Sequence, residues 1–81
     1  MFIDYSRVMT LTGHTKTIKS VAFDKNNMLA SGAYDMTIKL WNSNLGYLIK
    51  TLTGHNGGVS VVAFDNNNLL VSGSIDLTIK V

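Results

Sequence analysis

The chain has 81 residues, of which 46% are hydrophobic and 15% are charged, so it is too apolar and too weakly charged for a disordered segment and is at most one small domain. Its net charge is +2 and its lysines are scattered singly, which argues against nucleic-acid binding, because nucleic-acid binders cluster basic residues on one face. The absence of cysteine excludes a disulfide framework and a thiolate metal site.

The first ten residues, MFIDYSRVMT, contain no basic region followed by an apolar run. Nowhere does the chain approach the roughly 18 consecutive apolar residues that a membrane span needs. We therefore expect neither a secretion signal nor a membrane association, and we expect a cytoplasmic or nuclear protein. Residues 5–12 align loosely with residues 46–53 and are predicted to form one strand.

Four short apolar and β-branched runs follow, separated by turn residues about every eight to twelve positions, which favours an antiparallel meander. The predicted strands cover residues 18–23, 28–33, 37–41 and 47–52. The breaks between them, DKNN, YD and NSNLG, are rich in Asn, Asp and Gly. These residue types tolerate left-handed backbone and bond their own main chain, so each break is predicted to be a tight turn.

A sequence repeat is the strongest signal in the chain. Shifting the sequence by 41 positions aligns residues 10–40 with residues 51–81 without a gap, and 18 of the 31 aligned positions are identical. The runs MLASGA and VVAF are apolar or small at nearly every position, which is typical of strands covered on both faces. One sheet cannot cover both of its own faces, so the two units are expected to stack as neighbouring repeats. A period near 40 with four strands per unit predicts a β-propeller blade.

The motifs GH, VAFD, LASGAYDMTIKLWN and LVSGSIDLTIKV resemble the WD-repeat β-propeller family over nearly the whole chain. The resemblance implies an all-β fold of β-propeller blades, each a four-stranded antiparallel sheet, with about two blades here. Residues 1–12 would be the outer strand of a preceding blade, 13–53 the first blade, and 54–81 a second blade lacking its end. Asn42 departs from the family pattern, which most often has Asp after the Trp.

The resemblance also implies a structural clamp that ties the GH loop to the turn between the second and third strands of each blade. His14 would reach Asp35, and Ser31 and Trp41 would complete a hydrogen-bonded relay. In the second unit the equivalent residues are His55, Ser72 and Asp76. A buried His that donates to a carboxylate and is satisfied on its other nitrogen is well suited to hold two loops together.

A Ser-His-Asp catalytic triad is the competing hypothesis for these residues. It is disfavoured because the same trio occurs twice at identical spacing, among apolar strands. His14 and His55 would lie a blade apart without a further nitrogen or sulfur ligand, so no metal site is predicted. No phosphate-binding glycine motif is present. We therefore expect no enzyme and no cofactor.

Family members resembling this chain bind proteins and peptides on the face that carries the GH loops. The exposed positions on that face would be Thr17, Lys19 and Tyr34 in the first unit, and Gly58, Ser60 and Ile75 in the second. Tyr34 is the kind of anchor that dominates interface energy. The alternative is that Tyr34 and Ile75 only cover their own loops.

The predicted strands make up one outer strand of a preceding blade, one complete blade and three strands of a second blade. Propellers close with about four to eight blades. Two hypotheses fit: the chain is a fragment of a longer scaffold that binds a protein or peptide, or it is a self-assembling module whose copies close a ring. A head-to-tail contact of the second kind closes a ring or extends into filaments.

Overall fold

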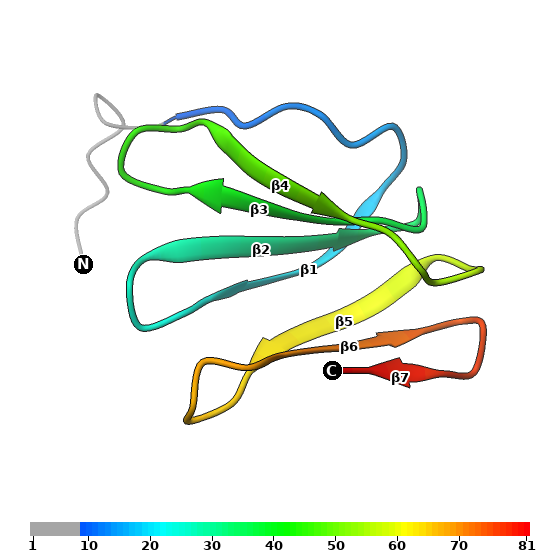
Figure 1. Ribbon diagram of the computed structural model, residues 1–81. Coiled ribbons are helices and arrows are strands. Elements are labelled where there is room, and N and C mark those ends of the chain that lie inside the picture. The colour runs from blue at the N-terminus through cyan, green and yellow to red at the C-terminus, as the bar shows by residue number, and fades with distance from the viewer. Residues whose placement is uncertain (1–8) are drawn as a thin grey trace, which may run out of the picture.

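The computed structural model describes residues 9–81, which form seven β-strands in two antiparallel sheets (Figure 1). This part of the chain has no helix that is long and apolar enough to cross a membrane. Blade 1 is the four-stranded sheet with the order β1-β2-β3-β4, and blade 2 is the three-stranded sheet with the order β5-β6-β7. The strands are β1 (Ile18–Phe23), β2 (Met28–Ala33), β3 (Ile38–Asn42), β4 (Leu48–Leu52), β5 (Val59–Phe64), β6 (Leu70–Ser74) and β7 (Ile79–Lys80).

The predicted all-β fold and antiparallel meander are therefore confirmed, and the first two strands have the predicted bounds. The third strand begins one residue later than predicted, because the N–H of Thr37 donates to the Asp35 carboxylate at 3.0 Å and so belongs to the turn. Residues 5–8, the first half of the outer strand predicted at residues 5–12, lie outside the described residues. Residues 9–12 are not in a strand but run past the β3–β4 turn, where Met9 and Leu11 lie beside Gly46.

The two hairpins at the ends of β1 and β5 are built alike, as the repeated sequence predicts. The Asp24 carboxylate accepts hydrogen bonds from the backbone N–H groups of the second and fourth residues after it, at 2.8 Å each, and Asp65 does the same at 2.8 and 2.9 Å. The backbone of Asn27 has φ 63° and that of Asn68 has φ 60°. Both Asn residues take the left-handed conformation expected of them.

The two blades pack face to face through their inner strands, with β5 lying against β1 and β2 (Figure 1). The shared core contains Ala30 and Ile38 from blade 1 and Val59 and Val62 from blade 2, each at most 5% exposed. Gly32 keeps this contact close, because a Cβ there would lie 2.6 Å from Val59 Cγ1. The stacking predicted from the repeat is thus the main source of the core.

The outer face of each blade is left open in the described structure. Val62 of β5 is 4% exposed against blade 1, whereas Val21, the equivalent residue of β1, is 59% exposed. Val61, on the far side of β5, is 51% exposed. Within residues 9–81, VVAF is therefore covered on one face only, and the cover predicted for its second face is not present in this part of the chain.

Candidate functional site

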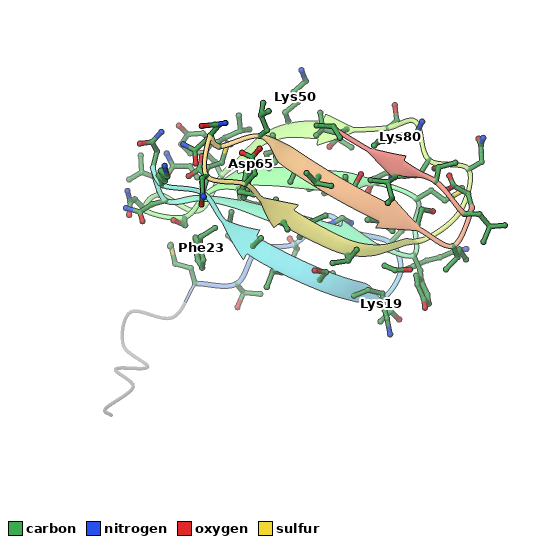
Figure 2. All side chains as sticks on the ribbon, turned by 90° about the horizontal axis from the view of Figure 1, so that it is seen from below. Lys19, Phe23, Lys50, Asp65 and Lys80 are labelled. Atoms are coloured by element: carbon green, nitrogen blue, oxygen red, sulfur yellow. The ribbon has the colours of Figure 1, made fainter. Side chains whose placement is uncertain are left out.

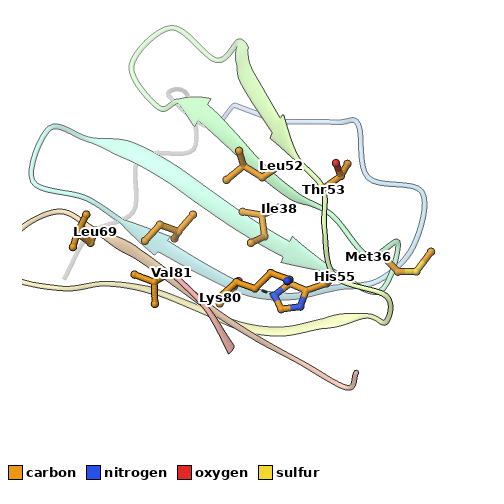
Figure 3. Close-up of a pocket in the computed structure, with 10 residues that line it drawn as sticks. Met36, Ile38, Leu52, Thr53, His55, Leu69, Lys80 and Val81 are labelled. Atoms are coloured by element: carbon orange, nitrogen blue, oxygen red, sulfur yellow. Dashed lines mark hydrogen bonds between the residues drawn. The ribbon is translucent and has the colours of Figure 1, made fainter. Parts of the chain in front are cut away.

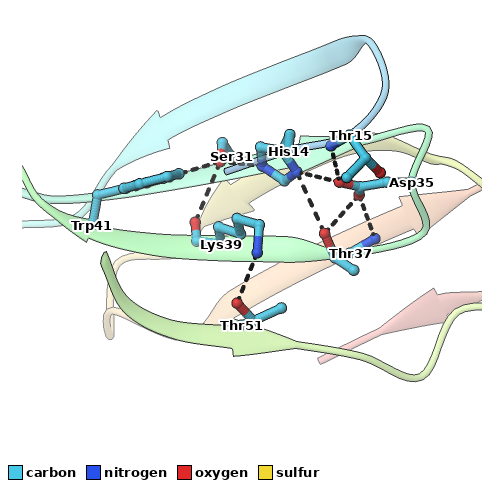
Figure 4. A network of polar contacts seen from close by, with 8 residues as sticks. All are labelled: His14, Thr15, Ser31, Asp35, Thr37, Lys39, Trp41 and Thr51. Carbon is cyan, nitrogen blue, oxygen red and sulfur yellow. Dashed lines mark hydrogen bonds and ion pairs between the residues drawn. The ribbon is translucent and has the colours of Figure 1, made fainter. Parts of the chain in front are cut away.

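A chain of four side chains crosses blade 1 from its core to its loop end (Figure 4). His14 Nδ1 lies 2.8 Å from an oxygen of the Asp35 carboxylate, and His14 Nε2 lies 2.7 Å from the Ser31 hydroxyl. The Trp41 indole N–H donates to the same hydroxyl at 2.8 Å. The structure thus brings together the four residues that the resemblance assigned to the first clamp.

The directions of these hydrogen bonds follow from what each group can do. The Trp41 indole only donates and an ionised Asp35 only accepts, so a proton on Nδ1 of His14 is the one that reaches the carboxylate. In that tautomer Nε2 accepts the proton of the Ser31 hydroxyl, whose oxygen remains free to accept from Trp41. Each of these four side chains then has a hydrogen-bond partner for its polar atoms. Among the described residues, no buried side-chain polar atom lacks a hydrogen-bond partner.

Besides the N–H of Thr37, two further donors from the loops that it joins reach the Asp35 carboxylate. The backbone N–H of Thr15 donates to it at 3.1 Å from the GH loop, and the Thr37 hydroxyl donates at 2.6 Å from within the turn. The two loops that meet here belong to segments about 20 residues apart in sequence. The carboxylate is therefore the point at which the GH loop is held to the β2–β3 turn.

Blade 2 repeats this arrangement without an indole. His55 Nδ1 lies 3.1 Å from the Asp76 carboxylate, and His55 Nε2 lies 2.8 Å from the Ser72 hydroxyl. The N–H of Asn56 donates to Asp76 at 2.9 Å, and the Thr78 hydroxyl donates to it at 2.5 Å. All three residues predicted for the second clamp therefore come together as well.

Both carboxylates are held in the ionised form. Burial on its own would raise the pKa of Asp35, but the hydrogen bonds from Thr37, His14 and the N–H of Thr15 together outweigh it and hold that pKa well below its ordinary value. For Asp76 the hydrogen bond from Thr78 is the largest influence, and it lowers the pKa in the same direction. An ionised carboxylate is the form that accepts all of these donors.

Thr37 and Thr78 are the site residues that sequence reasoning missed. Each stands two positions after the Asp of its blade and belongs to the TIK run that is identical in both units. Thr and Asp at this spacing are a local signal for a side chain that bonds within a turn. The run was instead assigned to strand pairing.

The geometry of blade 1 does not favour catalysis by Ser31. Its side chain is 3% exposed, and its oxygen already accepts from Trp41, so the hydroxyl cannot approach a substrate carbonyl. Residues 9–81 also contain no group of three or more His, Asp or Glu side chains placed to hold a metal ion.

The predicted partner face lies at the end of the blades where the GH loops and the β2–β3 and β6–β7 turns meet. Figure 2 shows Lys19 at this end of β1 and Phe23 at the opposite end. Tyr34 is 40% exposed and Ile75 is 61% exposed, and Thr17, Lys19 and Ser60 are exposed as well. We call these five exposed residues the loop-end patch.

Gly58 does not belong to this patch, although its exposure was predicted. It is buried beneath the Tyr34 ring, and a Cβ on it would lie 2.4 Å from Tyr34 Cδ1. The Tyr34 ring thus crosses from blade 1 onto the backbone of blade 2, and Lys19 Nζ lies 5.2 Å from the centre of the same ring. The glycine backbone of the sequence GHNGG thus packs against the Tyr34 ring.

Comparison with known proteins finds the same architecture. The family model described as "WD domain, G-beta repeat" matches residues 5–42 and again residues 46–81. The nuclear distribution protein nudF of Aspergillus niger is 39% identical over 49 residues, which cover 58% of this chain and 11% of nudF. Mitochondrial division protein 1 of Candida glabrata is 44% identical over 45 residues, which cover 51% of this chain and 6% of that protein.

Among solved structures, the crystal structure of the computationally designed Ika4 protein resembles this chain with a TM-score of 0.77 and 41% sequence identity. The similarity covers 88% of this chain and 43% of Ika4. The described sheets therefore follow a known arrangement of repeats, and this chain spans about a tenth or less of the length of the two curated relatives named above.

Proposed function

Because the chain belongs to the WD40 repeat family, we propose that it is a non-catalytic scaffold that binds a protein or peptide partner, in the cytoplasm or nucleus. WD40 repeats are typically scaffolds without chemistry of their own. The clamps of the two blades would then serve to hold the loops that carry the binding surface in one conformation.

The observation that carries this proposal is the position of Tyr34. Its ring rests on the backbone of Gly58 in the neighbouring blade and so has a fixed orientation, yet it remains 40% exposed. A large ring that is already ordered loses little conformational entropy when a partner covers it. Exposed Ile75 lies at the equivalent turn of blade 2. Two apolar anchors on rigid turns are the usual centre of a protein interface.

The charge near Tyr34 indicates what kind of partner fits. Lys19 stands over the ring, and Lys16 is exposed in the adjacent GH loop. Asp35, which follows Tyr34 in the sequence, is engaged by His14, Thr15 and Thr37, so its charge is already compensated by hydrogen bonds. A peptide that combines an apolar side chain with a carboxylate would complement the loop-end patch.

A selection from a random peptide library against the immobilised chain tests the proposal. The selected peptide is then measured against Tyr34→Ala and against Leu45→Ala, which removes a 73% exposed side chain from the β3–β4 turn at the opposite end. We expect a loss of about tenfold or more for Tyr34→Ala and no change for Leu45→Ala. Equal binding by Tyr34→Ala and the parent chain would place the partner elsewhere and overturn the proposal.

A second candidate function, a self-assembling structural module, is favoured by the apolar surface on the open side of β1. Residues 18, 21 and 23 of this strand are 47%, 59% and 61% exposed. Their equivalents in blade 2, residues 59, 62 and 64, pack against blade 1. The open side of β1 is therefore built like a surface that already binds a blade, and a second copy of blade 2 is a partner of matching chemistry.

Light scattering after size exclusion decides between the two candidates. If copies assemble head to tail, the chain elutes at several times the monomer mass, and Val21→Lys returns it to the monomer, because a charge would be buried in the new contact. Leu45→Lys is the control and leaves the mass unchanged. A monomeric parent chain, or an assembly indifferent to Val21→Lys, would exclude the self-assembling module.

A further inference from the structure

The loop between β4 and β5 contains an Asn-Gly pair, Asn56 and Gly57, directly after His55. Figure 3 shows Thr53 and His55 on this segment. The chain has eight asparagines, and Asn56 is the only one followed by glycine. The side chain of an asparagine can react with the backbone nitrogen of the next residue, and a side chain on that residue crowds the ring that forms. Glycine has no Cβ and adopts backbone conformations that other residues avoid, so this pair is the most reactive of the eight.

The loop is open to water on both sides of its blade. Asn56 is exposed, although blade 1 packs against one side of blade 2. Its equivalent in the repeat, Thr15, is also exposed, although blade 2 packs against the other side of that blade. The position therefore stays exposed with a neighbouring blade on either side, and its accessibility is a property of the loop.

The backbone nitrogen of Gly57 is also available to react. Within residues 9–81 its N–H donates no hydrogen bond. The chain is held on each side of it, because the N–H of Asn56 donates to Asp76 at 2.9 Å and the Ser74 hydroxyl donates to the oxygens of Gly57 and Gly58 at 3.1 and 2.9 Å. The reactive pair thus stays at the surface of the folded chain.

At most of the other asparagines the nitrogen that would react is already hydrogen-bonded. The N–H groups that follow these asparagines and donate within their turns, at 2.8 to 3.1 Å, are those of Met28, Leu45, Asn67, Asn68 and Leu69. Such a bond has to break before the nitrogen can attack. The two remaining asparagines, Asn26 and Asn42, are followed by Asn27 and Ser43, whose side chains crowd the ring.

The reaction balances with water as its only added reagent. The Gly57 nitrogen attacks Asn56 Cγ, a C–N bond forms, and the bond from Cγ to the side-chain nitrogen breaks. Ammonia leaves and carries away the proton of the Gly57 N–H. Water then opens the cyclic imide. Opening at the side-chain carbonyl gives aspartate, and opening at the main-chain carbonyl gives isoaspartate, in which an additional CH₂ lies in the main chain.

Either product is poorly tolerated by the second clamp. It places a carboxylate on residue 56, whose N–H lies 2.9 Å from the ionised Asp76 carboxylate, and like charges at this range repel each other. Isoaspartate also lengthens the main chain just before Gly57. A Cβ on Gly57 would lie 2.9 Å from Ile75 Cγ1 and 3.0 Å from Asp76 N, so the lengthened chain has little room there.

We propose that Asn56 is a site of spontaneous deamidation to aspartate and isoaspartate, and that the products release the GH loop of blade 2 from Asp76. The reaction needs neither a partner nor an enzyme, so the proposal does not depend on the binding function. Gly58, which lies under the Tyr34 ring, follows two residues later. Release of the loop therefore also loosens the contact that orients Tyr34.

Incubation of the purified chain at mildly alkaline pH, followed by digestion at acidic pH and mass spectrometry of the peptides, tests the modification. We expect conversion at Asn56 several-fold faster than at Asn42, with aspartate and isoaspartate as separable products. An isoaspartate-specific methyltransferase identifies the second product. Asn56→Gln is the matched control, because it keeps the amide but would have to form a larger ring, and it should abolish the conversion. An unmodified Asn56, or conversion no faster than at Asn42, would overturn the proposal.

Hydrogen exchange measured by NMR on the incubated ¹⁵N-labelled chain tests the effect on the clamp. The N–H of residue 56 should exchange several-fold faster in the modified chain than in Asn56→Gln. The N–H of Thr15, which donates to Asp35 in the first clamp, is the internal control and should not change. Asn56→Asp adds the charge without lengthening the chain, so a smaller effect is expected. If residue 56 exchanged at the same rate in modified and control chains, deamidation would not release the loop.

Discussion

Substitution of Gly32 by Ala tests the packing of the two blades, because Gly32 lies where β2 meets β5. A Cβ added there would lie 2.6 Å from Val59 Cγ1 and 3.0 Å from Val62 Cγ1. These two side chains are 0% and 4% exposed, so they have little room to move. The blades would have to separate by several tenths of an ångström. We therefore expect the free energy of unfolding to fall.

The magnitude follows from two opposing effects. Overpacking a tight core contact costs about 1–3 kcal/mol. Replacement of Gly by Ala inside a strand stabilises the fold by roughly 0.5–1 kcal/mol, because it lowers the conformational entropy of the unfolded chain. The net loss for Gly32→Ala then lies between about 0 and 2.5 kcal/mol, with a central value of about 1 kcal/mol. Gly73 is the equivalent glycine in blade 2, where a Cβ would meet only Val61 Cγ1, at 3.0 Å. Val61 is 51% exposed and can turn away, so Gly73→Ala is expected to be neutral or stabilising by up to about 0.5 kcal/mol.

Urea denaturation of both variants, followed by circular dichroism, measures the difference directly. Because the two substitutions are chemically identical and occupy the same position in the repeat, their difference isolates the contact between the blades. The reasoning would be refuted if Gly32→Ala were as stable as Gly73→Ala, since the blades would then not be packed through this face.

Four further results are expected. His14→Ala should cost about 1–3 kcal/mol of unfolding free energy, because Asp35 and Ser31 lose a buried partner; an unchanged melting temperature would contradict the clamp. Trp41 is the only tryptophan and is 4% exposed, so its fluorescence should shift to longer wavelength on unfolding, and Trp41→Ala should cost about 3–5 kcal/mol; unchanged emission would contradict its burial. The pKa of Asp35 is lower in the folded than in the unfolded chain, so its contribution to stability is present above about pH 4 and is lost as pH falls below that value. In urea melts at several pH values, the free energy of unfolding of Thr37→Val should therefore fall less on acidification than that of the parent chain. An equal fall would mean that the Thr37 hydroxyl does not lower this pKa. Leu77 has φ 71° and is 96% exposed, so Leu77→Asn should stabilise by up to about 1 kcal/mol, and a less stable variant would show that the turn is not strained.

Local patterns in the sequence were sufficient for the strands and the turns. The strand at 28–33 could be predicted from its run of small and apolar residues between two turns, and its bounds agree with the structure. The hairpin at Asp24 could be predicted because Asp and Asn bond their own main chain. The left-handed backbone of Met36, with φ 71°, could not be predicted from the sequence. A bulky side chain disfavours this conformation, and Met lacks the short polar group that lets Asn and Asp adopt it. That conformation is imposed by the turn around Asp35.

The sequence by itself determined the repeat, the all-β class and the spacing of the clamp residues, since these depend on short-range periodicity and on residue identities at matching positions. Tertiary structure alone decided which face of each strand is covered. Val21 and Val62 are the same residue type at equivalent positions, yet one is 59% and the other 4% exposed, because within residues 9–81 only the second has a sheet packed against it. The same physical reason buries Gly58 under Tyr34. Burial depends on both of the surfaces that pack together, and the sequence of one strand does not specify its neighbour.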